Sequence, residues 1–122
     1  MPLPDDTIVH RVGGAAVENL RLGRLDAAAV PPGLSVLTGG TPGQAAAQMR
    51  AAYQSRKWQA AEVVASASAA AVRAAGFDVV AMSTNKLPNH ARLTHPAGLA
   101  GFTDDNLRLL AQAFQTTPGT DQ

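Results

Sequence analysis

The polar side chains most able to do chemistry are concentrated in the short segment Pro88–Pro96. If this segment is extended, alternation places His90, Arg92 and Thr94 on one face. An imidazole next to a guanidinium can bind a phosphate or a carboxylate, and the imidazole can also exchange a proton near neutral pH. We therefore predict that Asn89, His90 and Arg92 bind an anion or a partner. The alternative is an edge strand with a solvated face.

Three residues are candidates for catalysis, namely His90, His95 and Ser35. The two histidines point to opposite faces of an extended strand, and the chain has no cysteine to complete a zinc site, so we predict no metal. Ser35 lies on a short strand bracketed by Pro31-Pro32-Gly33 and Gly39-Gly40. It is the candidate nucleophile, although a strand residue facing water is the alternative interpretation.

A second cation, Arg11, lies in the β-branched segment Thr7–Val12. Alternation places His10 on one face of this predicted strand and Arg11 on the other. We predict that Arg11 joins Arg92 in binding an anion. The sequence leaves open whether His10, Arg11, Ser35 and His90 converge on one site.

Other motifs give weaker signals. Paired carboxylates for acid–base work are wanting, because Asp5-Asp6 lies in the N-terminal segment and Asp104-Asp105 serves a helix start. The remaining candidates, Glu18, Asp26, Glu62 and Asp78, are isolated along the chain. The glycine pairs match no nucleotide-binding loop, although the helix after Leu37–Thr41 could receive an anion at its free amides. Arg56-Lys57-Trp58 could stack on a single strand of nucleic acid, but a helix end with a half-buried anchor is the favoured interpretation.

Hydrophobic periodicity and turn residues predict alternating short strands and helices. Thr41-Pro42-Gly43-Gln44 combines a capping residue, an N-terminal proline and a capping-box glutamine, which predicts a helix over 42–53. The apolar run Phe77–Met82 predicts a central strand covered on both faces. Further strands are expected at 7–12, 34–37, 62–65 and 91–94. A short helix or irregular segment is expected within 18–29, and helices are expected at 69–73 and from Thr103 to about Phe114. An unbroken helix over 58–75 is the alternative to the strand at 62–65.

Composition limits the class of protein. The chain has 122 residues, a net charge of +1 and no cysteine, which together exclude a disulfide scaffold and a global field for nucleic acid or an anionic membrane. Neither a secretory signal nor a membrane span is visible, so we expect a soluble cytoplasmic protein without a cofactor. The predicted fold class is α+β, a compact small mixed sheet of about five strands with two to four packed helices. Residues 1–114 should form one domain and 115–122 a flexible tail.

Short motifs carry two resemblances. Pro-Pro-Gly-Leu-Ser-Val at 31–36 and Pro-Asn-His-Ala-Arg-Leu at 88–93 resemble small uncharacterised bacterial proteins of similar length, with a Leu-Ser-Val strand and a later Asn-His-Ala element. That resemblance implies a component of a toxin–immunity or defence locus. Arg11 or His10 with Ser35 is more loosely similar to ADP-ribosyltransferase-type toxins, but no glutamate follows Glu62, so the late catalytic glutamate of those toxins is missing.

Two functional hypotheses follow. The first is a protein-binding or immunity-type module, or a homo-oligomer, that uses the His90 and Arg92 face or the helix over 42–53. The second is a small enzyme acting on a nucleotide or other phosphorylated substrate, in which Arg11 and Arg92 bind the anion and His90 or His95 is the acid–base group. Nucleic acid and membrane are not expected partners.

Overall fold

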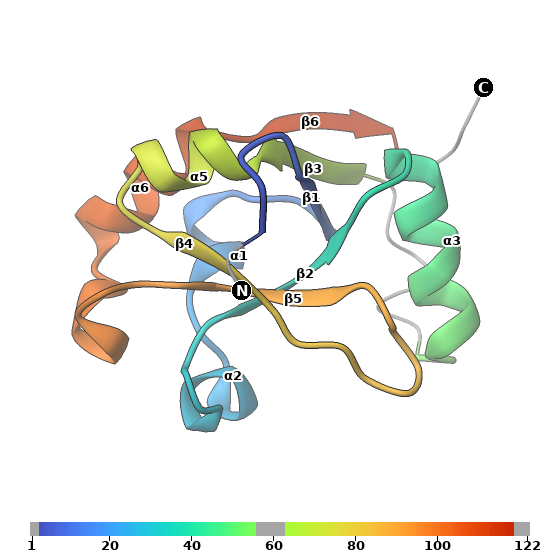
Figure 1. Cartoon of the computed structure of the whole chain (residues 1–122), viewed down its shortest axis with the longest axis horizontal. Helices are drawn as coiled ribbons and strands as arrows, with labels where there is room; N and C mark the ends of the chain where they lie inside the picture. The colour runs from blue at the N-terminus through green and yellow to red at the C-terminus, as the bar shows by residue number, and fades with distance from the viewer. Residues whose placement is uncertain (1–2, 56–62, 119–122) are drawn as a thin grey trace.

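The computed structural model describes residues 3–55 and 63–118, which form one six-stranded sheet with helices packed on it (Figure 1). The strands are β1 (Ile8–Val12), β2 (Leu34–Thr38), β3 (Val63–Ser68), β4 (Asp78–Ala81), β5 (His90–Thr94) and β6 (Gln115–Pro118). The α+β class is confirmed. The sheet has six strands rather than about five, and its pairings are all antiparallel rather than mixed.

Five α-helices lie within the described ranges, slightly more than predicted. They are α1 (Val17–Leu20), α2 (Arg24–Ala28), α3 (Pro42–Ala52), α5 (Ala69–Ala74) and α6 (Asp104–Gln112), and a 3-10 turn, η1, covers Gly98–Gly101. The predicted capping box of α3 is confirmed, because the Thr41 hydroxyl accepts from the amide of Gln44 and the Gln44 side chain accepts from the amide of Thr41. The Ser68 and Thr103 hydroxyls cap α5 and α6 by accepting from the amides of Ala71 and Asn106.

The strand order is β4-β5-β2-β1-β3-β6, and it corrects two predictions. β4 is an edge strand, so the central position expected for Phe77–Met82 is wrong. Phe77, just before β4, and Val79 within it are buried by packing instead, with Phe77 edge-to-face against His95 and Phe102. β5 is an inner strand paired on both sides, so the solvated-edge alternative for the Pro88–Pro96 segment is also wrong.

The two faces of the sheet carry separate hydrophobic clusters. On one face, α5 and α6 cover the larger cluster, which includes Val9, Leu34, Val79, Leu93 and Leu107. On the other face, α3 places Met49 over Val12, Leu37 and Val64. The alternation predicted for β1 explains this division, since Val9 faces one cluster and Val12 the other.

β1 and β2, the two central strands, pair over a short length only. Their register joins Val9 to Thr38 and His10 to Leu37, and it goes no further toward Ser35. By contrast, β1 pairs with β3 through all five of its residues. The strands therefore separate beyond His10, and main-chain groups of β2 in that region need other partners.

The C-terminal segment corrects the predicted tail. Gln115–Pro118 forms β6, which pairs with β3 from Ser66 to Val63. Polar composition predicted disorder, but an edge strand needs only its main chain to pair, so exposed Gln and Thr side chains are compatible with it. In the part of the chain that the structure describes, no helix is both long and apolar enough to cross a membrane.

Candidate functional site

A cavity of about 550 Å³ lies on the α3 side of the sheet, where β1 and β2 separate. Its walls come from α2, from β1, β2 and β5 of the sheet, and from the C-terminal end of α3. The polar residues that line it are His10, Arg11, Arg24, Asp26, Ser35, Thr84, His90 and Arg92. The structure thus brings together His10, Arg11, Ser35 and His90, whose convergence the sequence left open, and places Arg92 with them.

The charges of this cavity are unbalanced. Three arginines, Arg11, Arg24 and Arg92, line it against one carboxylate, Asp26. Without counting the histidines, three positive charges and one negative charge leave an excess of two positive charges. A partly enclosed site with this imbalance attracts an anion, because charges interact more strongly away from bulk water.

Arg92 is the central cation of the cavity, and its side chain is 16% exposed. One terminal nitrogen, Nη1, donates to Asp26 Oδ1 at 2.9 Å and to the carbonyl of Gly33 at 2.7 Å. Gly33 can approach this closely because it has no side chain; a Cβ there would collide with the carbonyl of Leu93. No hydrogen bond to the described residues uses Nη2 or Nε of Arg92, so these donors are available to a ligand.

Ser35 lies beside Arg92, its cross-strand partner. The Ser35 hydroxyl donates to Asp26 Oδ1 at 3.3 Å, so this carboxylate oxygen accepts hydrogen bonds from both Ser35 and Arg92. Among the described residues no histidine accepts from this hydroxyl. The arrangement suits Ser35 to orient Asp26 or to bind a ligand, and it lacks the base that a nucleophile needs.

Arg11 contributes charge more than contact. Its Nη1 donates to the carbonyl of Ser35 at 2.9 Å and its Nη2 to the carbonyl of Asn19 at 2.7 Å. The remaining nitrogen, Nε, is buried and has no hydrogen-bond partner in the described chain. Burial lowers the pKa of Arg11, and the nearby charge of Asp26 partly opposes this effect. The predicted role of Arg11 in an anion site is therefore electrostatic.

His90 lies at the cavity wall and is 8% exposed. Its Nδ1 lies 2.9 Å from the carbonyl oxygen of Met82, and since a carbonyl can only accept, Nδ1 carries the proton. In the neutral ring, Nε2 is then the acceptor nitrogen, and no side chain of residues 3–55 or 63–118 donates to it. The cross-strand partner of His90 on β2 is Leu37, and that of Arg92 is Ser35. Since each pair is two residues from the other along its strands, His90 and Arg92 are neighbours on one face of the sheet.

His10 also lines the cavity but is satisfied at both nitrogens. Nε2 lies 3.1 Å from the carbonyl of Gly40 and must donate to it, so Nδ1 accepts from the Ser66 hydroxyl at 2.7 Å. Burial lowers the pKa of His10, and hydrogen bonds to the main chain at Gly40 and Gly39 partly offset this. His10 is therefore held neutral and serves the core.

The other end of the cavity is apolar. Leu37 from the sheet, Met49 and Tyr53 from the C-terminal end of α3, and Leu87 from the loop before β5 line it. Lys86 lies 5.0 Å from the centre of the Tyr53 ring. A ligand that fits the whole cavity therefore has an anionic group near Arg92 and an apolar or planar body near Tyr53.

Two predicted site residues lie outside the cavity. His95 follows β5 on the opposite side, where its ring packs against Phe77 and its Nδ1 accepts from the amide of Ala97. The side chain of Asn89 joins the start of β5 to β2 and α3. Its Nδ2 donates to the main-chain carbonyl of Thr38, and its Oδ1 accepts from the Gln48 side chain. The structure gives Asn89 a positioning role and removes His95 from the acid–base candidates of this cavity.

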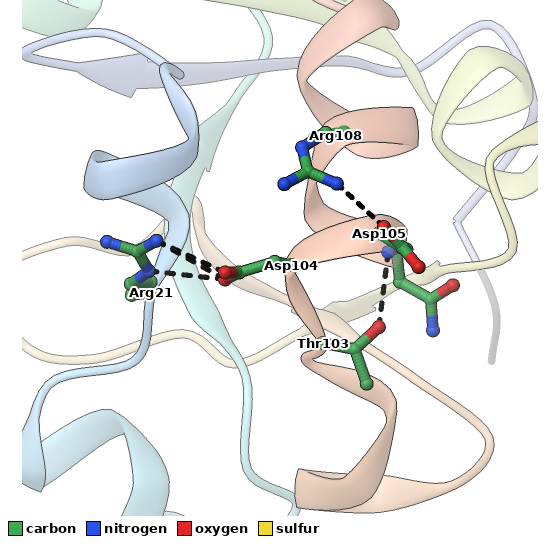
Figure 2. A network of polar contacts seen from close by, with 6 residues as sticks. Arg21, Thr103, Asp104, Asp105 and Arg108 are labelled. Carbon is green, nitrogen blue, oxygen red and sulfur yellow. Dashed lines mark hydrogen bonds and ion pairs between the residues drawn. The ribbon is translucent and has the colours of Figure 1, made fainter.

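A second polar network, between α1 and α6, is separate from the cavity (Figure 2). Arg21 donates to both oxygens of Asp104 at 3.3–3.4 Å, and Arg108 donates to Asp105 at 2.6 Å. All four side chains are more than half exposed. Such exposed ion pairs contribute little to stability, so these residues are suitable controls for the cavity residues.

Asp26 is the main functional residue that sequence reasoning missed. It was visible only as an isolated carboxylate, because its partner Arg92 is 66 residues away. Arg56-Lys57-Trp58, the predicted nucleic-acid motif, falls outside the described residues. Within the described ranges, no group of three or more His, Cys, Asp or Glu side chains could hold a metal ion.

Comparison with protein-family models, with curated proteins and with solved structures finds no match for this chain. The resemblance to small bacterial proteins of toxin–immunity loci therefore stays a prediction from short motifs.

Proposed function

We propose that the cavity binds a small phosphorylated ligand, whose phosphoryl group meets Arg92 and whose body lies against Tyr53 and Met49. The observation that carries this proposal is the cluster of three arginines around one carboxylate in a cavity of ligand size. Arg92 offers a planar fork of donors that matches phosphate oxygens. A nucleotide has the required combination of anionic group and planar body.

Binding can be tested by calorimetry with inorganic phosphate, pyrophosphate and adenosine monophosphate. The nucleotide should bind more tightly than phosphate because it also fills the apolar end. Arg92→Gln should weaken binding by about 10- to 100-fold, the value of one or two hydrogen bonds to a charged group. Arg92→Lys should lose part of the affinity, since lysine keeps the charge but not the fork.

Arg108→Gln is the matched control, because Arg108 lies on α6 in an exposed ion pair with Asp105. The Arg108→Gln variant should bind phosphate, pyrophosphate and adenosine monophosphate with the affinity of the wild type. Circular dichroism would show whether each variant is folded. The proposal fails if the folded wild type binds none of the three probes at millimolar concentration.

The second part of the proposal is that His90 exchanges a proton with the bound ligand. Its protonated Nδ1 is fixed by Met82, which leaves Nε2 as the acceptor. The balanced step is hydrolysis: His90 Nε2 takes a proton from water, the water oxygen bonds to phosphorus, and the bond from phosphorus to the nucleoside or nucleotide leaving group breaks. Phosphorus NMR of the protein with nucleoside mono- and triphosphates would detect the inorganic phosphate released. His90→Gln should abolish product formation while nucleotide binding remains. Unchanged turnover in this variant would remove His90 from the mechanism.

Binding of a protein partner is the second candidate function. Leu25 lines the cavity and is 83% exposed, so apolar surface adjoins the arginines. His90 and Arg92 lie inside the cavity rather than on an open face, and a partner would therefore have to insert an acidic side chain. A protein that is monomeric in light scattering and captures no partner from its native host would argue against this function.

A further inference from the structure

The short helix α2, which forms one wall of the cavity, is weakly attached to the rest of the fold. It has five residues and none of them is buried. Figure 1 shows it projecting from the sheet, away from the larger helices. Leu25 on α2 and Val30 just after it are almost fully exposed. Hydrophobic packing therefore contributes little to the position of α2.

The side-chain hydrogen bonds that join α2 to the described sheet all end on Asp26 Oδ1. They come from Arg92 at 2.9 Å and from Ser35 at 3.3 Å. A main-chain bond from Gly33 to the carbonyl of Asp26 adds a third link at 3.3 Å. Arg92 uses one nitrogen for this pair, although a guanidinium can hold a carboxylate through two. The pair is partly exposed, with Asp26 at 25%, so water and ions can compete for it.

We propose that Asp26 is a built-in counter-ion, and that a phosphoryl group enters the cavity by exchanging with it at Arg92, which releases α2 from the sheet. The inference rests on the proposed function and identifies the residue that sets the charge of the ligand. A ligand carboxylate gains nothing by this exchange, because one monoanion replaces another. A phosphate dianion gains a second charge and a third oxygen, so Asp26 selects phosphorylated ligands over carboxylates.

Asp26→Asn separates the charge from the shape of this residue. The asparagine oxygen can still accept from Ser35 and Arg92, but the competing negative charge is gone. We expect inorganic phosphate to bind about tenfold more tightly to this variant than to the wild type. Acetate, which should not bind measurably to the wild type, should bind to Asp26→Asn. The matched control is Asp104→Asn, which removes a carboxylate from the exposed pair with Arg21 and should change neither affinity.

Release of α2 can be measured separately, because the chain has no cysteine and one introduced thiol can be labelled uniquely. A spin label at Val30→Cys should become more mobile when inorganic phosphate is added. The same label at Leu109→Cys, an exposed position on α6, should not respond. Asp26→Asn should already show part of the increased mobility without phosphate.

The outcomes distinguish this inference from the proposed function. If neither the wild type nor Asp26→Asn binds phosphate, the proposed function fails and the inference with it. Binding that is unchanged or weaker in Asp26→Asn would mean that Asp26 orients Arg92 for the ligand, which overturns the inference and leaves the function. If the mobility of the spin label at position 30 does not change when phosphate binds, the release of α2 is likewise overturned.

Discussion

The guanidinium of Arg11 takes the place of a missing strand partner for Ser35. Its Nη1 donates to the Ser35 carbonyl at 2.9 Å, at the point where β1 and β2 no longer pair. The Thr38 amide donates to the carbonyl of Asn89, the residue just before β5, so alternation turns the Ser35 carbonyl toward β1. A side chain thus satisfies a main-chain group that the sheet leaves unpaired, and the space beside it becomes the cavity.

Arg11→Met should destabilise the fold by about 1–3 kcal/mol, because it leaves the carbonyls of Ser35 and Asn19 without donors. Urea unfolding followed by circular dichroism would measure this change. Arg11→Lys should recover part of the loss through a single amine. Arg108→Met is the control for loss of an exposed arginine, and a loss as large as that of Arg11→Met would contradict the prediction.

Acid should weaken the fold through His10. Burial lowers its pKa below the ordinary 6.5, so as the pH falls the unfolded chain takes up this proton before the folded one. The contribution of His10 to the free energy of unfolding is therefore complete above pH 6.5, and it declines as the pH falls from there toward the lowered pKa of His10 in the folded state. The urea midpoint of the wild type should drop over this range. His10→Gln should have a lower urea midpoint than the wild type, and its midpoint should change less with pH. If the midpoint of the variant changes with pH as much as that of the wild type, His10 is not the group responsible.

The capping box of α3 should be measurable as stability. Thr41→Ala removes the hydroxyl that accepts from the Gln44 amide at 3.1 Å, and we expect a cost of about 1 kcal/mol. Thr41→Ser keeps the hydroxyl and should restore most of it. Because α3 carries Met49 and Tyr53 over the cavity, the same loss should reduce nucleotide affinity. Equal stability of the alanine and serine variants would show that the cap contributes nothing.

Gly101 and His95 should be energetically coupled. A Cβ at position 101 would overlap the ring of His95, which is itself packed against Phe77. Gly101→Ala should therefore cost about 1–3 kcal/mol in the wild type. In a His95→Ala background the same change should cost clearly less, as a double-mutant cycle would report. Additive costs would mean that the ring and the new methyl group do not compete for space.

Local signals in the sequence predicted most elements of the fold but not their order. The capping box before α3, the alternation of β1 and the cap of α6 act within a few residues, so they can be recognised in the chain itself. The edge position of β4 and the inner position of β5 depend on pairings between distant segments. β6 has no apolar pattern, since it pairs through its main chain at the edge.

The site was predictable in part for the same reason. Alternation on β5 correctly placed His90 and Arg92 on one face and separated them from His95. The contact of Arg92 with Asp26 depends on how a weakly attached helix folds back over the sheet, and no local pattern encodes it. Likewise, the polar residues around Asn89 in the sequence do not predict that its side chain hydrogen-bonds to Thr38 on β2 and to Gln48 on α3.

The short ladder between β1 and β2 divides the sheet mechanically into two halves of three strands, β4-β5-β2 and β1-β3-β6. Each half has continuous ladders of four or five residue pairs, whereas the seam between them has two. A small change of angle at this seam would widen or narrow the cavity without breaking a hydrogen bond inside either half. Arg11 spans this seam, because it lies on β1 and its Nη1 donates to the Ser35 carbonyl on β2.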